Sequence, residues 1–210
     1  MMKTGKTIKS APASFRDPSG HLFYSDDILY RAISKVYKNH YDGLMNSGLY
    51  NDLVGRGWLI PHEEVGDFSL ANDDSYKTIK PKIIDFVSYP YEWSFSQLKD
   101  AALLTLNIQK RALDCGMTLK DASAYNIQFY NGKPILIDTL SFEIYEENKP
   151  WVAYKQFCQH FLAPLALMAL KDVRLNQLLK IYIDGIPLDL ASVLLPFYSR
   201  FKFSLLTHIH

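Results

Sequence analysis

A chain of 210 residues is long enough for one substantial hydrophobic core or two small lobes, and its 48% hydrophobic and 21% charged residues are ordinary for a folded protein. The 23 Lys and Arg nearly balance the 22 Asp and Glu, which leaves a net charge of +1. This balance excludes a global field that would attract nucleic acid or an anionic membrane, so any recognition of phosphate must be local.

The cysteines and the apolar runs favour a cytoplasmic protein. Cys115 and Cys158 are not in a paired spacing that would suggest zinc or redox chemistry, and a reducing cytoplasm is the simplest setting. Residues 1–14 contain three Lys with no apolar stretch after them, which predicts a flexible tail and not a signal peptide. The most apolar run, residues 161–170, is far shorter than the roughly 20 residues of a membrane span and is expected to be a buried helix.

Residues 15–93 are predicted to form a strand-rich N-terminal part. The residues Asp17-Pro18-Ser19-Gly20 suit a type I turn, and β-prone residues follow them. The predicted elements are strands at 21–24, 28–33, 58–60 and 82–87, a helix at 41–54 that glycines end, a loop at 65–74, and a connector at 88–93 that a central proline keeps from being a regular helix.

Residues 94–210 are predicted to form a helix-rich C-terminal part. A long helix should begin at about Ser94 or Ser96, with the serine as its cap, keep one face apolar and stop at Gly116. Asn131-Gly132 between two β-prone runs predicts a tight hairpin that ends at residue 138, since both turn residues tolerate a positive φ. The remainder is expected to be mostly helical, at 151–179 and 188–206. The predicted fold class is therefore α+β, with a strand-rich N-terminal lobe and a helix-rich C-terminal lobe.

Three polar residues surround this hairpin. Asp121 and Asn126 stand five residues apart in the loop that follows the long helix, and Asp138 comes directly after the apolar run Ile135-Leu136-Ile137. Because the strands of a hairpin are antiparallel, Asn126 and Asp138 are expected side by side at the same end. A carboxylate and an amide oxygen can share Mg²⁺, which completes its shell with waters and substrate phosphates. Asp121 would lie at the edge of such a site and could orient an attacking hydroxyl.

This order of elements resembles the catalytic loop and metal-binding Asp of protein-kinase-like and aminoglycoside-phosphotransferase-like enzymes. The resemblance implies that Asp121 is the catalytic residue and that Asn126 and Asp138 are metal ligands. It implies ATP and Mg²⁺ as cofactors and a kinase-like two-lobe architecture. No Ala-Pro-Glu ending of a protein-kinase activation loop follows Asp138, which favours a small-molecule acceptor over a protein substrate.

The N-terminal part carries weaker signals. It has no G-x-G-x-x-G loop, and the nearest equivalent of the kinase strand Lys is Arg31 in Leu29-Tyr30-Arg31-Ala32-Ile33. Tyr89, Tyr91 and Trp93 in the connector could stack on an adenine or pack between the lobes. The missing phosphate loop and strand Lys leave a second hypothesis open, a pseudokinase-like module that binds a nucleotide without transferring phosphate.

A second resemblance covers more of the chain. Four segments resemble the N-terminal region of longer bacterial proteins usually labelled class I SAM-dependent methyltransferases: 88–100, 119–126, 137–143 and 150–154. That label implies a Rossmann-like domain with a Gly-rich first turn, and the 10 glycines of this chain form no such cluster. The chain is therefore expected to correspond to a kinase-like front part, with a methyltransferase domain as a possible partner.

Overall fold

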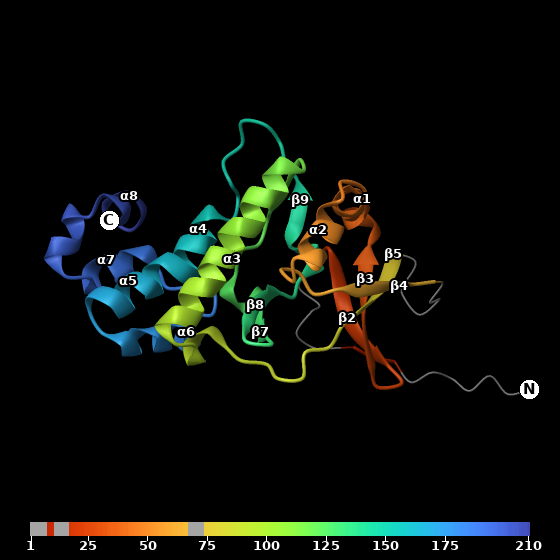
Figure 1. The fold of residues 1–210 in the computed structure, drawn as a ribbon, viewed down its shortest axis with the longest axis horizontal. Helices are drawn as coiled ribbons and strands as arrows, with labels where there is room; N and C mark the ends of the chain where they lie inside the picture. The colour runs from red at the N-terminus through yellow and green to blue at the C-terminus, as the bar shows by residue number, and fades with distance from the viewer. Residues whose placement is uncertain (1–7, 11–16, 67–73) are drawn as a thin grey trace, which may run out of the picture.

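The computed structural model describes residues 8–10, 17–66 and 74–210. A strand-rich part comes first along the chain and a helical part second, which confirms the predicted α+β fold class. Figure 1 shows the sheet at one end of the molecule and the C-terminal helices at the other, with α3 (Phe95–Asp114) and a small hairpin between them. The predicted tail lies mostly outside the described residues, apart from β1 (Ile8–Ser10), which pairs with the next strand.

The N-terminal part is a five-stranded antiparallel sheet in the order β1-β2-β3-β5-β4. β2 (Gly20–Ser25) and β3 (Ile28–Ser34) occupy the two strands predicted here, joined by a tight turn in which Asp26 and Asp27 have positive φ. The predicted helix is two helices, α1 (Lys38–Asn46) and α2 (Leu49–Gly55), because Gly48 between them has φ +77°. β4 (His62–Val65) and β5 (Ser75–Pro81) complete the sheet.

Two predicted strands of this part were wrong. Residues 82–87 do not form the predicted strand; they are irregular, and Phe86 is 76% exposed. The strand of this region is β5, which lies earlier in the sequence and ends at Pro81. Residues 58–60 form no strand of the sheet. Instead Ile60 N donates to Leu136 O at 2.8 Å, which attaches this segment to the C-terminal hairpin. β-prone residues served as connections here, because partners distant in the sequence decide where pairing occurs.

The long helix follows the prediction closely. Ser94 accepts from Gln97 N, and the Gln97 side chain accepts from Ser94 N, which is a capping box at the start of α3. The helix ends before Gly116, whose φ of +70° suits a helix stop. Its apolar face is buried in the main core: Leu98, Ala101, Ala102, Leu104, Ile108 and Ala112. This face fixes the loop that follows against the rest of the molecule.

The hairpin β7 (Ile127–Tyr130) and β8 (Lys133–Leu136) also matches the prediction. Asn131 and Gly132 have φ values of +51° and +74°, as a type I′ turn requires. A second small pair, β6 (Met117–Leu119) with β9 (Phe142–Ile144), was not predicted. It encloses the loop and the hairpin, so that residues 120–126 and 137–141 lie next to each other.

The chain ends in short helices: α4 (Tyr154–Phe157), α5 (Ala163–Leu170), α6 (Leu178–Ile181), α7 (Leu188–Leu194) and α8 (Phe203–His208). The segment between α6 and α7, which the predicted helical regions 151–179 and 188–206 leave out, contains Gly185 with φ +94°. Helices α5 to α8 share a core of their own around Leu167 and Leu179, whereas Phe157 of α4 packs against the main core. No helix in the described part of the chain is long and apolar enough to cross a membrane.

Candidate functional site

A cleft of about 780 Å³ separates the N-terminal sheet from the β7–β8 hairpin. One end of it is polar and is lined by Arg31, Asn126, Gln128, Asp138 and Thr139. The walls are mostly apolar: Leu22, Ile28, Leu29, Ile60, Ile79, Ile83, Ile84, Val87 and Ile137. Such a combination suits a ligand with a flat apolar group and a charged end.

Charged side chains of the lining favour an anion slightly. Arg31, Lys80 and Lys82 are basic, whereas Asp27 and Asp138 are acidic. Lys82 lies over the ring of Tyr130, with 4.7 Å from its Nζ to the ring centroid. The lining therefore carries three basic and two acidic side chains, and Asp17, outside the lining, adds a second carboxylate beside Arg31.

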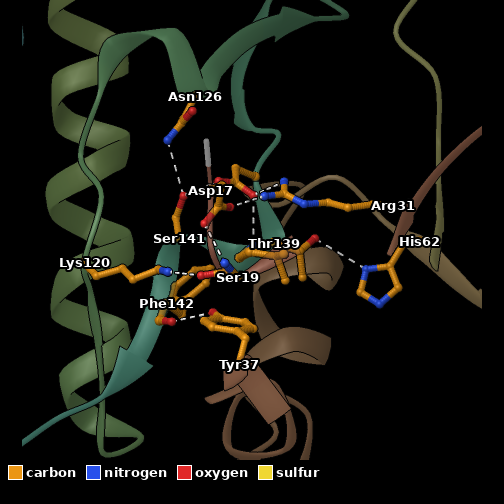
Figure 2. A network of polar contacts seen from close by, with 12 residues as sticks. Asp17, Ser19, Arg31, Tyr37, His62, Lys120, Asn126, Thr139, Ser141 and Phe142 are labelled. Atoms are coloured by element: carbon orange, nitrogen blue, oxygen red, sulfur yellow. Dashed lines mark hydrogen bonds and ion pairs between the residues drawn. The ribbon is translucent and has the colours of Figure 1, made fainter. Parts of the chain in front are cut away.

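Arg31 is held between two carboxylates at the polar end. Its Nη2 donates to Asp17 Oδ2 at 2.8 Å, and its Nη1 forms an ion pair with Asp138 Oδ1. The Arg31 and Asp138 side chains are only 15% and 17% exposed, so the pair is shielded from water. Figure 2 shows Arg31 of the sheet and Asp17 of the segment before β2 directed toward each other.

The structure brings Asn126 and Asp138 together, as the antiparallel hairpin implies. Ile137 N donates to Asn126 O at 2.8 Å, which joins their backbones. Asn126 Nδ2 lies 3.3 Å from Ser141 Oγ, and the Ser141 hydroxyl donates to Asp138 Oδ2 at 3.0 Å. Asp138 also caps the 3-10 turn Thr139–Ser141 by accepting from Leu140 N. Ser141 was not predicted as a site residue; only its position three residues after Asp138 could have suggested it.

Asn126 and Asp138 fit a magnesium ion that takes most of its ligands from phosphates and water. They offer one amide oxygen and one carboxylate on the same wall of the cleft, and both oxygen types suit Mg²⁺. In the described part of the chain no cluster of three His, Cys, Asp or Glu side chains could hold a metal alone. A metal ion would therefore bind here only together with a ligand that supplies further oxygen atoms.

Asp121 lies in the loop that leads to Asn126 but is not part of the cleft lining. Its Oδ1 accepts from Ser123 N at 2.9 Å, and Ala122 N next to it donates to Gln156 Oε1 at 2.7 Å. The buried His160 is close enough to interact electrostatically with Asp121, although burial dominates and lowers the pKa of this imidazole to about 4. The loop is thus anchored on α4 and the π-helical turn after it.

The connector aromatics do not line the cleft. Trp93 is 2% exposed, packs its ring edge against Phe129 and donates from Nε1 to Ser88 Oγ. Tyr89 and Tyr91 stack on each other with ring centroids 5.4 Å apart. Trp93 is thus buried against the hairpin, whereas Tyr89 is 44% exposed.

Several contacts fix the segment that carries Asp138. The Tyr37 hydroxyl donates to Phe142 O, and burial raises the pKa of this phenol. Thr139 Oγ1 lies 3.4 Å from His62 Nδ1, and burial lowers the pKa of His62 to about 4, which leaves it neutral at pH 7. Lys120, directly before Asp121, donates to Ser19 Oγ. The two parts of the chain therefore meet through polar contacts around the site (Figure 2).

The chain was compared with protein-family models, with curated proteins and with solved structures. No protein-family model matches the chain. The chain is 32% identical over 194 residues to "Nodulation protein NoeA" of Rhizobium meliloti (strain 1021), a match that covers 89% of this chain and 40% of NoeA. The chain therefore spans less than half of the length of this curated relative.

Solved structures include one match to "vaccinia related kinase 3". It covers 72% of this chain and 53% of that chain at 14% sequence identity, with a TM-score of 0.41.

Proposed function

We propose that this chain binds a nucleotide together with Mg²⁺ in the cleft and transfers a phosphoryl group to a hydroxyl of a small-molecule acceptor. The observation that carries the proposal is the cleft itself, in which apolar walls lead to a polar end formed by Arg31, Asn126 and Asp138. The base of ATP would lie between the apolar walls, and its phosphates would lie toward the polar end.

The proposed roles follow the chemistry of each group. Asn126 and Asp138 would hold Mg²⁺, which neutralises charge on the phosphates when it is bound. Arg31 would contact a phosphate oxygen, because a guanidinium is suited to this geometry. Asp121 would accept a hydrogen bond from the acceptor hydroxyl and orient it. The two free cysteines fit the proposed cytoplasmic setting.

A second candidate is a nucleotide-binding or regulatory module without catalysis. The observation that favours it is the engagement of Arg31 by both Asp17 and Asp138, which leaves the equivalent of the kinase Lys occupied by protein groups. Such a module could serve a methyltransferase domain, as the second sequence resemblance implies. NoeA, of which this chain matches 40%, has room for a further domain of some kind.

Replacing Asp121 with Asn distinguishes the two candidates. A transferase should keep its affinity for ATP within about twofold and lose at least about 100-fold in phosphoryl transfer, which is the usual contribution of such a group. The measurement is ADP release from Mg-ATP with a panel of hydroxylated small molecules, beside calorimetric binding of ATP. Asp100→Asn, at an exposed position on α3, is the control and should change neither quantity.

Wild-type protein that binds ATP and releases no ADP with any acceptor supports the second candidate. Transfer that survives in Asp121→Asn contradicts the role of Asp121.

A further inference from the structure

Asp17 does not line the cleft, but it contacts Arg31 at the polar end and has no proposed role yet. Its Oδ2 accepts from Arg31 Nη2 at 2.8 Å, while Asp138 takes the other terminal nitrogen of the same guanidinium. Both terminal nitrogens of the guanidinium are therefore engaged by carboxylates of the protein. Two carboxylates around one guanidinium also leave the trio with a net negative charge.

The backbone holds Asp17 firmly in this position. Its Oδ1 accepts from Ser19 N at 2.9 Å, and its carbonyl oxygen accepts from Gly20 N at 3.3 Å. Ser19 is in turn bonded to Lys120, and its carbonyl oxygen accepts from Ser34 N at 2.9 Å. The carboxylate is thus presented to Arg31 by a well-anchored turn.

We propose that Asp17 is a specificity-determining residue, which restricts Arg31 to phosphate ligands that arrive with a divalent cation. This inference rests on the proposed nucleotide site and adds the rule by which that site selects its ligand. A free polyphosphate would meet the net negative charge of the trio and would have to displace Asp17. A metal-bound nucleotide carries less negative charge, and its cation attracts the carboxylates that Arg31 gives up.

The test is Asp17→Asn, because asparagine keeps the Oδ1 acceptor for Ser19 N and removes only the charge that faces Arg31. Calorimetric titrations with ATP, with and without Mg²⁺, give the ratio of the two dissociation constants. In the variant, metal-free ATP should bind at least about tenfold tighter than in the wild type, and the ratio should fall accordingly. Urea unfolding confirms that the variant is folded.

Asp172→Asn is a matched control. Asp172 accepts from Arg174 N through Oδ1 at 2.9 Å and pairs with the Arg174 guanidinium through Oδ2 at 2.6 Å, so its local chemistry copies that of Asp17. The two carboxylate side chains are similarly exposed, at 36% and 33%, and Asp172 lies outside the cleft lining. This control should leave the ratio at the wild-type value. The same fall in both variants, or no fall in Asp17→Asn, overturns the role of Asp17.

Failure of the proposed function gives a different result. If the wild type binds no ATP with or without Mg²⁺, the nucleotide site is wrong. Inorganic tripolyphosphate then tests Asp17 alone: tighter metal-free binding by Asp17→Asn, by at least about tenfold, still supports its role. No gain in that titration overturns the inference as well.

Discussion

Arg31→Met should destabilise the protein by about 3 kcal/mol at pH 7. The methionine can replace the apolar stem of Arg31, but it removes the charge that separates Asp17 from Asp138. Asp138, 17% exposed, would face a second carboxylate without a cation, and the removal of one partner from a shielded ion pair is costly. Urea unfolding followed by tryptophan fluorescence measures the loss.

Two comparisons separate this effect from simple loss of a side chain. Arg174→Met, at an ion pair whose arginine is 85% exposed, should cost less than about 0.5 kcal/mol. In a background of Asp17→Asn and Asp138→Asn, Arg31→Met should cost at most about 1 kcal/mol, because no carboxylates remain to repel each other. A cost in that background as large as in the wild type would show that packing, and not charge, explains the loss.

Gly20→Ala should destabilise the protein by a similar amount, about 3 kcal/mol. A Cβ at Gly20 would lie 2.1 Å from the carbonyl oxygen of Ala32 and 3.1 Å from Leu140 Cδ1. The first neighbour is backbone of the adjacent strand β3, so it cannot move aside without a shift of the β2–β3 pairing. Thermal and urea unfolding both report the change.

Gly55→Ala is the matched control for that substitution. A Cβ at Gly55, the last residue of α2, meets nothing within 4 Å, and its backbone is not in the positive φ region. Stability should stay unchanged or rise by about 0.5 kcal/mol, because alanine loses less backbone entropy in a helix. If Gly20→Ala costs no more stability than Gly55→Ala, the backbone of β3 moves aside easily, and the close approach of β2 to β3 is not rigid.

Local chemistry explains which parts of the fold could be predicted from the sequence. Ser94 and Gln97 cap a helix with an apolar face, and Asn131-Gly132 joins two β-prone runs, so each element is specified by residues near in the sequence. The strand wrongly assigned to residues 82–87 has the right composition for a strand. The residues that pair between β3 and β4 are instead those of β5, which ends at Pro81, and residues 82–87 form the irregular connection that leaves the sheet.

In the site, too, contacts set by nearby residues could be predicted, whereas contacts between distant residues could not. The antiparallel hairpin was enough to predict that Asn126 and Asp138 lie together, since the turn sets their register. Asp17 could not be predicted, because a turn sequence gives no sign that its carboxylate will meet an arginine 14 residues away. Nothing in the sequence indicated that the Trp93 ring would pack against Phe129 on the hairpin, because that contact joins residues distant in the sequence.

Calorimetric titration of ATP into the wild type and into Asp138→Asn, each with and without Mg²⁺, tests whether the cleft binds a nucleotide with Mg²⁺ through Asp138. The cleft, with Asp138 at its polar end, predicts that the wild type binds ATP in the presence of Mg²⁺. The substitution should weaken that binding at least about tenfold, because Mg²⁺ loses its carboxylate ligand. Arg174→Met, far more exposed, should bind as the wild type does. If the wild type binds no ATP, or if Asp138→Asn keeps the metal-dependent binding unchanged, the proposed nucleotide site at Asp138 is wrong.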